Sequence, residues 1–444
     1  MTQILIYTAV RHPRLDYVLE QIQSYTSACQ WRLCMDRDEF AAADAVCIDY
    51  GNHQIRKDAY PIPFTGWLNR PLAEYQHIPV QNEGGELLLF PSDQSGSFDL
   101  FAAVFYLLAR VEEYLPFQED ALGRFPAQAS LLYTYKALRT PLVDQWVDEL
   151  IRTLEFRSGR AIPRASIHPA WSLGIDVDQF YKYRHKSFFK TAGGMFRALV
   201  LGKAAEFKTR FRVCANSIRD PFDSYDRIFD LKIPDNQLLF FILSGGRSRF
   251  DKNHKLSHRR VSCCLHEIAQ RAKVGLHPSY SSALDARSVA MEKKNLEDAL
   301  DKPVRFSRHH YLRIRFPQTY RLLLELKFQQ DYSMGYPDQA GFRAGTCRPF
   351  YWYDLGRERQ TTLLLFPIAA MDRCYLQADA LSSEEIVHDI LDLWQTCQRH
   401  GGHFHLNWHN SSLDFEDEWK GWENVLPIII QQLQKHETPP QSGQ

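Results

Sequence analysis

Four short segments in the second half of the chain end in polar residues after an apolar run. They read Gly174-Ile175-Asp176-Val177-Asp178, Gly275-Leu276-His277-Pro278, Arg308-His309-His310-Tyr311 and Leu406-Asn407-Trp408-His409. Two carboxylates, several imidazoles and a guanidinium at one rim suit a metal-assisted hydrolase, because such a site holds a cation while a water beside it loses a proton. No other feature of the sequence narrows the chemistry as much.

Asp176 and Asp178 are two residues apart, so their side chains lie on the same side if the strand continues through them. One carboxylate can then bind a metal ion while the other accepts a proton. The alternative is a helix N-cap followed by an exposed acid, which is a common use of Asp. His277 follows another apolar run and precedes Pro278, a position that suits a ligand better than a core histidine.

The same half of the chain alternates between strand-like and helix-like segments. Strands are expected at residues 171–175, 237–243, 273–276, 304–306, 330–333, 362–367 and 402–408. Helical periodicity is clearest over residues 382–400, where Ser382 and Glu385 form a predicted capping box. This alternation predicts a parallel sheet, either open or closed.

The last strand helps to choose between an open and a closed sheet. Its two faces differ: one carries only polar side chains, His403, His405, Asn407 and His409, and the other only apolar ones. A sheet covered by helices on both sides is apolar on both faces, whereas a polar inner row fits a barrel with functional groups at the carboxyl ends of its strands. The alternative is an edge strand with one wet face. We expect an α/β fold with an irregular (β/α)7 barrel.

The global composition is that of an ordinary globular protein. The 444 residues include 53 Lys or Arg and 53 Asp or Glu, so no net field favours a polyanion, and nucleic-acid binding is not expected. The nine cysteines form no Cys-x-x-Cys pair, which suits reduced thiols in a cytoplasmic protein and disfavours a thiolate zinc site. No apolar run approaches bilayer-spanning length, and residues 1–10 suggest a first strand rather than a secretory leader.

Four regions are expected along the chain. Residues 1–155 form a smaller mixed α/β domain of unknown role, in which the clearest element is a buried amphipathic helix over residues 98–114. Residues 156–170 form a linker, residues 171–436 the barrel and residues 437–444 a flexible tail.

A basic segment, residues 182–212, follows the first barrel strand. It contains nine Lys or Arg and one acid, Glu206, interleaved with large apolar residues, namely Phe188, Phe189, Phe196, Leu199 and Leu201. Such a segment can attract an anionic glycan, or it can lie on an anionic membrane surface as an amphipathic helix. The alternative is a solvated helix that packs its apolar face on the barrel.

Over about residues 170–435 the order of these segments resembles that of the NodB-homology polysaccharide deacetylases of carbohydrate esterase family 4. Their Thr-Phe-Asp-Asp-Gly motif is similar to residues 174–178, which implies that Asp176 is a base and Asp178 a metal ligand. Their Arg-x-Pro-Tyr motif is similar to residues 308–311, which implies that Arg308 orients the base and that the Tyr311 backbone N–H binds an oxyanion. Their Leu-x-x-His motif matches residues 406–409, which makes His409 the general acid. Residues 98–101 and 112–116 resemble an uncharacterised domain that precedes such modules in bacterial proteins.

In one place the chain departs from this family. The second family motif has two histidines four residues apart, but position 281 is serine here, so His277 lacks its partner. A catalytic zinc-like site generally has three protein ligands and one open position. We therefore expect His310, at the position of the family's proline, to join Asp178 and His277 around a divalent ion, expected to be zinc.

The resemblance implies a metal-dependent enzyme that removes acetyl groups from a glycan or sugar intermediate, by cleaving an amide or ester bond. Candidates for contact with the substrate are Tyr280, Asp331, Arg343 and Arg348, although the two arginines equally suit ordinary surface ion pairs. Two other functions stay open. One is a catalytically impaired relative that binds carbohydrate in surface-polysaccharide assembly, and the other is a hydrolase of a small cyclic or linear amide.

Overall fold

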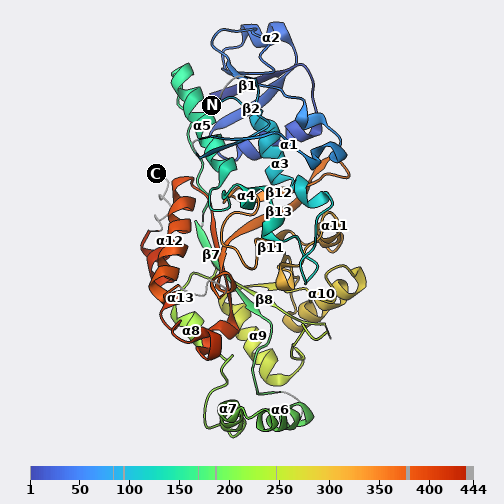
Figure 1. Ribbon diagram of the computed structural model, residues 1–444, viewed down its shortest axis with the longest axis vertical. Coiled ribbons are helices and arrows are strands. Elements are labelled where there is room, and N and C mark those ends of the chain that lie inside the picture. The colour runs from blue at the N-terminus through green and yellow to red at the C-terminus, as the bar shows by residue number, and fades with distance from the viewer. Residues whose placement is uncertain are drawn as a thin grey trace.

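The computed structural model describes residues 2–83, 85–93, 96–168, 170–185, 188–246, 248–376 and 381–436. The expected tail, residues 437–444, lies outside these residues. The described part divides along its long axis into an N-terminal α/β region and a barrel (Figure 1).

Seven parallel strands close the barrel in the order of their appearance along the chain. They are β7 (Trp171–Val177), β8 (Leu238–Ile242), β9 (Lys273–Leu276), β10 (Phe306–Ser307), β11 (Gln330–Met334), β13 (Arg359–Met371) and β14 (Phe404–His409). β11 pairs directly with β13, and β14 pairs with β7, so the ring of strands is complete. An eighth strand, β12 (Phe350–Asp354), runs antiparallel to β13 outside the ring. The predicted irregular (β/α)7 barrel is confirmed.

The polar face of β14 lies inside the barrel. In the pairing of β14 with β7, Asn407 lies opposite Gly174 and His409 lies opposite Asp176. His405 and Asn407 have no exposed surface, and Ser172 of β7 hydrogen-bonds the rings of both His403 and His405 at 2.7 Å. Because β14 has a partner on each side, it is not an edge strand.

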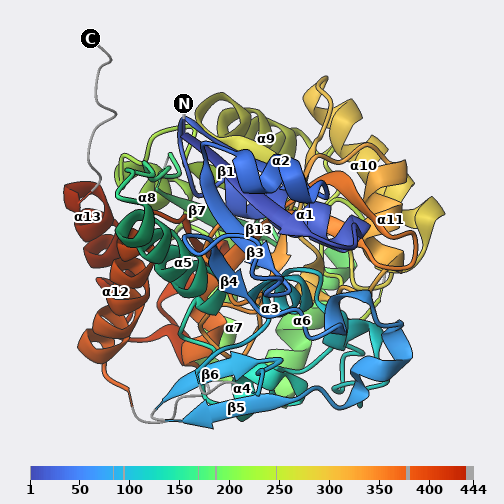
Figure 2. The same cartoon turned by 90° about the horizontal axis from the view of Figure 1, so that it is seen from above.

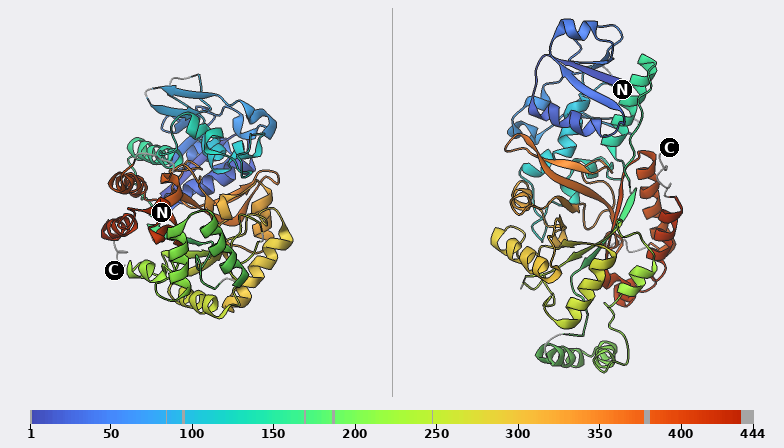
Figure 3. Two further views of the ribbon diagram at one scale, coloured as in Figure 1. Left: turned by 60° about the horizontal axis from the view of Figure 1, so that its bottom comes forward. Right: turned by 180° about the vertical axis from the view of Figure 1, so that it is seen from behind.

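Helices surround the barrel (Figure 3). They are α8 (Tyr225–Asp230), α9 (Arg259–Arg271), α10 (Ala286–Leu300), α11 (Gln318–Glu325), α12 (Ser383–Arg399) and α13 (Val425–His436). The predicted capping box of α12 is present, because the Glu385 N–H donates to Ser382 Oγ at 3.2 Å and the Ser382 N–H donates to Glu385 Oε2 at 2.7 Å. Two further helices, α6 (Phe188–Val200) and α7 (Ala204–Cys214), stand away from the barrel (Figure 1).

The N-terminal region contains a parallel four-stranded sheet in the order β2 (Cys29–Cys34), β1 (Thr2–Thr8), β3 (Val46–Tyr50) and β4 (Tyr60–Ile62). A hairpin of β5 (Val80–Glu83) and β6 (Glu86–Leu89) lies to one side (Figure 2). The helices are α1 (Pro13–Gln23), α2 (Arg37–Ala42), α3 (Leu100–Leu108), α4 (Leu131–Thr134) and α5 (Leu142–Ser158). α1 contacts both β12 and β13, so this region packs against one end of the barrel.

The expected helix over residues 98–114 is shorter than predicted. Asp99 caps α3, because its carboxylate accepts the N–H of Ala102, and the helix ends at Leu108. Arg110 has a left-handed φ of 53° and begins a separate 3-10 turn, Val111–Tyr114. This break turns the chain so that Glu113 points toward the barrel loop that carries Arg343.

The expected linker, residues 156–170, is attached to both regions. α5 continues to Ser158, and the segment after it then makes backbone hydrogen bonds from Ser27 to Pro163 (2.9 Å) and from Ala165 to Tyr25 (2.8 Å). Ile167 donates to Gly401 of the barrel at 3.1 Å.

Among the described residues, no helix has the length and hydrophobicity needed to span a bilayer.

Candidate metal centre

The carboxyl ends of four barrel strands bring the predicted site residues together. Asp176 and Asp178 lie at the end of β7, His277 follows β9, His310 follows β10, and His409 ends β14. Parallel strands direct their carboxyl ends to one rim of a barrel, so residues up to 233 positions apart in the chain meet there.

Asp178, His277 and His310 form a three-residue cluster. Asp178 Oδ1 lies 3.3 Å from His277 Nε2 and 3.4 Å from His310 Nε2. Asp178 Oδ1 and His277 Nε2 are buried atoms without a hydrogen-bond partner, which is costly unless something binds them. Ligand atoms about 2.0–2.1 Å from a tetrahedral ion lie roughly 3.3–3.4 Å apart. The donor set and these two distances therefore fit a divalent cation with one position left open.

Hydrogen bonds to the far ring nitrogens orient both imidazoles. His277 Nδ1 donates to the Arg308 carbonyl oxygen at 2.6 Å, and His310 Nδ1 lies 3.2 Å from Asp251 Oδ1. Because these partners are acceptors, each ring holds a proton on Nδ1, which leaves Nε2 as the atom that a metal ion beside Asp178 would bind. This is the orientation that metal-binding histidines adopt.

The charges of the cluster are strongly coupled. Burial alone would raise the pKa of Asp178, but the facing rings of His310 and His277 hold it well below its usual range. Burial alone would lower the pKa of His310, but Asp178 and Asp251 raise it to about 9. The carboxylate is thus kept ionised, as a metal ligand must be.

Ser281 stands where the resemblance led us to expect a second histidine. Its hydroxyl donates to Asp251 Oδ2 at 2.9 Å, and Ser248 Oγ donates to the same oxygen at 2.6 Å. The Tyr280 N–H donates to Asp251 Oδ1 at 2.7 Å. Ser281 therefore helps to position the carboxylate that orients His310, and the imidazole comes from the next strand end.

Asp176 lies beside the cluster and is held on two sides. Arg308 Nη1 donates to Asp176 Oδ1 at 2.8 Å, and Asn407 Nδ2 donates to Oδ2 at 3.1 Å. Arg308 has no exposed surface, and its guanidinium lies so close to Gly174 that a Cβ at that position would collide with it. Glycine in β7 therefore makes room for the arginine that fixes Asp176.

His409 faces Asp176 from the other side. Its Nε2 lies 3.8 Å from Asp176 Oδ2, which in turn lies 4.0 Å from His277 Nε2. Its Nδ1 donates to Asp372 Oδ1 at 2.8 Å. Burial alone would lower the pKa of His409, but the buried Asp372 carboxylate and Asp176 raise it to about 9, so the ring is protonated at neutral pH.

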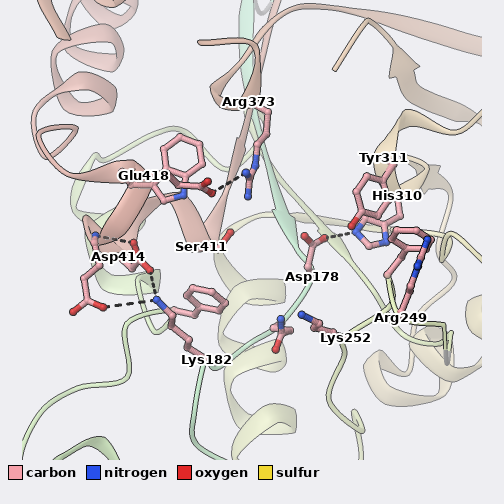
Figure 4. Close-up of a pocket in the computed structure, with 15 residues that line it drawn as sticks. Asp178, Lys182, Arg249, Lys252, His310, Tyr311, Arg373, Ser411, Asp414 and Glu418 are labelled. Atoms are coloured by element: carbon pink, nitrogen blue, oxygen red, sulfur yellow. Dashed lines mark hydrogen bonds and ion pairs between the residues drawn. The ribbon is translucent and has the colours of Figure 1, made fainter. Parts of the chain in front are cut away.

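A cavity of about 440 Å³ opens beside Asp178 and His310 (Figure 4). Its aromatic lining consists of Phe222, Phe250, Tyr311 and Trp419. Tyr311 has a left-handed φ of 60°, a conformation that is strained for a tyrosine and that places its backbone next to His310.

Lys182 pairs with Asp414 at 2.8 Å and Arg373 with Glu418 at 2.8 Å. Arg249 and Lys252 make no carboxylate contact within the described residues.

The predicted contacts of Asp331, Arg343 and Arg348 with substrate are wrong. Asp331 has no exposed surface and accepts hydrogen bonds from the hydroxyls of Ser307 and Ser333. Arg343 is buried in an ion pair with Glu113. Arg348 is buried and donates to the carbonyl oxygens of Ala165 and His400 at 2.6 and 2.9 Å. All three side chains hold the fold together and leave no face open to a substrate.

Tyr280 lies outside the lining of the cavity, and its hydroxyl donates to the Leu122 carbonyl oxygen at 3.3 Å. Its ring packs on Phe250, with centroids 4.5 Å apart, so it supports a residue of the lining. His309 does not join the cluster, because it is fully buried and both of its ring nitrogens lack a hydrogen-bond partner. Burial and the nearby His277 lower the pKa of His309 to about 3, so it stays neutral.

Sequence reasoning missed two carboxylates that orient the site histidines. Asp251 lies in the long loop after β8, where no local pattern distinguishes it from other loop acids. Asp372 directly follows β13, which is longer than the predicted strand of residues 362–367. The apolar residues Ile368 to Met371 were the signal that the strand continues to Asp372.

Comparison with known proteins matches residues 4–158 to DUF7033, a family of unknown function. The comparison with curated proteins found no match. Among solved structures, one from Mycobacterium smegmatis and one from Pseudomonas aeruginosa are described as polysaccharide deacetylases, and a third is described as Puue allantoinase.

These three structures share little sequence with the chain. Identities are 13%, 12% and 12% for the Mycobacterium, Pseudomonas and allantoinase structures, with TM-scores of 0.38, 0.38 and 0.39. The matches cover 61%, 60% and 60% of this chain and 86%, 85% and 84% of the other chains. The chemistry of this chain therefore has to be argued from the residues of the site.

Proposed function

We propose that the protein is a metal-dependent hydrolase that removes acetyl groups from a glycan or sugar intermediate. The observation that carries this proposal is the pair of buried atoms without partners, Asp178 Oδ1 and His277 Nε2, which face the same point as His310 Nε2. A divalent ion, expected to be zinc from the His2Asp donor set, would be held by these three residues. When bound, it supplies Lewis acidity, which acidifies a water molecule and polarises an acetyl carbonyl.

The remaining steps use side chains of this chain. Asp176 accepts the proton of the attacking water, while Arg308 and Asn407 fix the orientation of its carboxylate. As the new C–O bond forms, the Tyr311 backbone N–H donates to the oxyanion. His409 then gives its Nε2 proton to the leaving amine or hydroxyl, and acetate is released. Phe222, Phe250 and Trp419 provide apolar surfaces on which a sugar ring can pack.

Hydrolysis is tested by measuring acetate released from N-acetylated and O-acetylated oligosaccharides by the zinc-loaded protein. Asp176→Asn is expected to lower the rate by about 10²- to 10⁴-fold with unchanged metal content, because it removes the base and leaves the three ligands in place. Carbohydrate binding without any turnover would favour a binding relative, and turnover of small cyclic or linear amides alone would favour an amidase.

The metal ligands are tested by elemental analysis of the purified protein. His310→Ala is expected to lose the bound ion, because only two protein ligands remain. His309→Leu is the matched control, since it removes the neighbouring imidazole, which lies outside the cluster. Full metal stoichiometry in the His310→Ala protein would show that His310 is not a ligand.

A further inference from the structure

Helices α6 and α7 form a hairpin that projects beyond the barrel rim carrying the candidate site (Figures 1 and 3). The N-terminal sheet, with β1 and β2, lies at the opposite end of the molecule (Figure 1). The hairpin follows β7, whose end holds Asp176 and Asp178, and Lys182 at its base lines the cavity.

The base of the hairpin is fixed to the barrel. The Asp220 carboxylate accepts the backbone N–H groups of Lys182 (2.6 Å), Tyr183 (2.8 Å) and Arg184 (2.9 Å). The Arg184 guanidinium donates to the carbonyl oxygens of Val213 (3.2 Å) and Ile218 (3.0 Å). These hydrogen bonds join the segment that leads into α6 to the segment that follows α7. They fix the base of the hairpin beside the site.

The far end of the hairpin exposes large apolar side chains to solvent. Five of the sixteen exposed large apolar residues among the described residues lie here: Phe196 (68% exposed), Leu199 (65%), Val200 (66%), Leu201 (56%) and Phe211 (57%). Phe196, Leu199 and Val200 have the i, i+3, i+4 spacing of a single helix face. The sequence left open that the apolar residues of this segment pack on the barrel. These exposures exclude that for Phe196, Leu199 and Leu201. The side chains of Phe188 and Phe189 lie outside the described residues. A contiguous apolar group of this kind indicates an interaction surface.

The same two helices and their connection carry exposed positive charge. Arg197, Lys203, Lys208 and Arg212 are exposed, and none of them pairs with a carboxylate within the described residues. The single acid of the hairpin, Glu206, is paired with Arg210 at 2.9 Å. An anionic lipid bilayer has negatively charged headgroups at its surface and an apolar interior beneath them. Exposed apolar residues beside unpaired cations fit such a surface, because the apolar side chains can enter the interior while the cations contact the headgroups. A second copy of the hairpin would bring like charges together, which disfavours a symmetric dimer through this face.

We propose that the α6–α7 hairpin docks the protein on an anionic lipid surface and holds the candidate site toward that surface. Phe196, Leu199, Val200 and Leu201 enter the interfacial region, and the four unpaired cations contact lipid phosphates. The inference rests on the exposure and charge of the hairpin and holds whether or not the site hydrolyses acetyl groups. Docking in this way would hold the candidate site next to molecules carried by or lying on the bilayer.

The test is co-sedimentation of the full-length protein with phosphatidylcholine vesicles and with vesicles that also contain phosphatidylglycerol. We expect at least tenfold stronger binding to the anionic vesicles at low salt, weakened by added salt. Phe196→Ser/Leu199→Ser and Arg197→Glu/Lys208→Glu are each expected to reduce binding at least tenfold. Because all four residues are exposed, unchanged thermal melting confirms that the fold is intact. Phe156→Ser is the matched control, since Phe156 is 91% exposed on α5, away from the hairpin, and its variant should bind like wild type.

Insertion is read directly from a Leu201→Trp variant, whose added fluorescence should shift to the blue on anionic vesicles. Absence of binding to anionic vesicles at low salt would overturn the proposal, as would binding that the hairpin variants leave unchanged. Self-association that the hairpin variants abolish, without vesicle binding, would also overturn it and assign the face to a second copy of the chain.

Discussion

Asp372 and Asp251 each accept a hydrogen bond from a site histidine, yet we propose different roles for the two imidazoles. His310 faces Asp178 with its Nε2, where a bound ion would replace the proton that the raised pKa of this ring retains without it, whereas His409 faces Asp176 from outside the cluster. A ring that is a ligand must be unprotonated at Nε2, and a general acid must be protonated there. In this proposal, the position of each ring relative to Asp178, rather than its carboxylate partner, decides its role.

The protonation of His409 predicts the alkaline limit of activity. Its pKa is raised to about 9 by Asp372 and Asp176 against the effect of burial, so the acid form persists through neutral pH and is lost as the pH rises through about 9. We expect kcat/KM for acetate release to fall above pH about 9. Asp372→Asn removes the main opposing charge and should move this limit toward the ordinary imidazole value near 6.5. The measurement is a pH–rate profile of both proteins.

Ser412→Ala is the control for that profile, because Ser412 donates to Asp372 but carries no charge. Its alkaline limit should stay close to that of wild type. The same raised pKa means that the ion pair stabilises the fold fully below pH about 6.5 and is lost as the pH rises through about 9. An alkaline limit unmoved by Asp372→Asn would remove His409 from the role of acid.

At the scale of the elements, the sequence predicted the barrel strands better than it predicted the side-chain contacts between distant segments. Each of the seven predicted segments overlaps one strand of the ring, although residues 304–306 do so only at Phe306. Several of them are short apolar runs that alternate with helix-like segments. β12 was missed, since it pairs antiparallel outside the ring and has no helix after it. Asp251 contacts His310 from a long loop, and Arg343 pairs with Glu113, which is far away in the sequence. Neither contact produces a periodic pattern from which it could be predicted.

The contact between the turn Val111–Tyr114 and the barrel predicts a large loss of stability on mutation. The buried Glu113 carboxylate accepts from Arg343 Nε at 2.9 Å and from Arg110 Nε at 2.8 Å, and the two arginines keep the pKa of Glu113 lowered despite burial. Glu113→Ala leaves buried guanidinium charge without its partner, and we expect it to cost about 3–5 kcal/mol of unfolding free energy.

The measurement is urea unfolding followed by circular dichroism. Asp298→Ala is the matched control: it breaks an ion pair with Lys294 in which both side chains are mostly exposed, and it should leave the unfolding free energy nearly unchanged. If Glu113→Ala were as stable as this control, the buried pair would not hold the turn to the barrel.

At the scale of the whole molecule, the N-terminal region and the barrel share one hydrophobic core. Buried residues of α1 and α3 belong to the same contiguous cluster as those of β7, β13 and α12. Arg14 of α1 pairs with Glu358 at 2.6 Å, and the Tyr17 hydroxyl donates to the Tyr351 carbonyl oxygen at 2.8 Å. The family match to residues 4–158 thus covers a segment that is continuous with the barrel in its packing.

This shared core predicts that the two regions unfold together. Calorimetry of the intact chain should show one transition whose calorimetric and van't Hoff enthalpies agree. A fragment of residues 159–444 should fail to fold, because it exposes the apolar faces of β12 and β13 and leaves Arg343 without Glu113. Two separate transitions, or a soluble fragment with native near-UV circular dichroism, would show that the barrel is an independent domain and that the N-terminal region is merely attached. A single transition would instead make the N-terminal region part of the scaffold of the barrel.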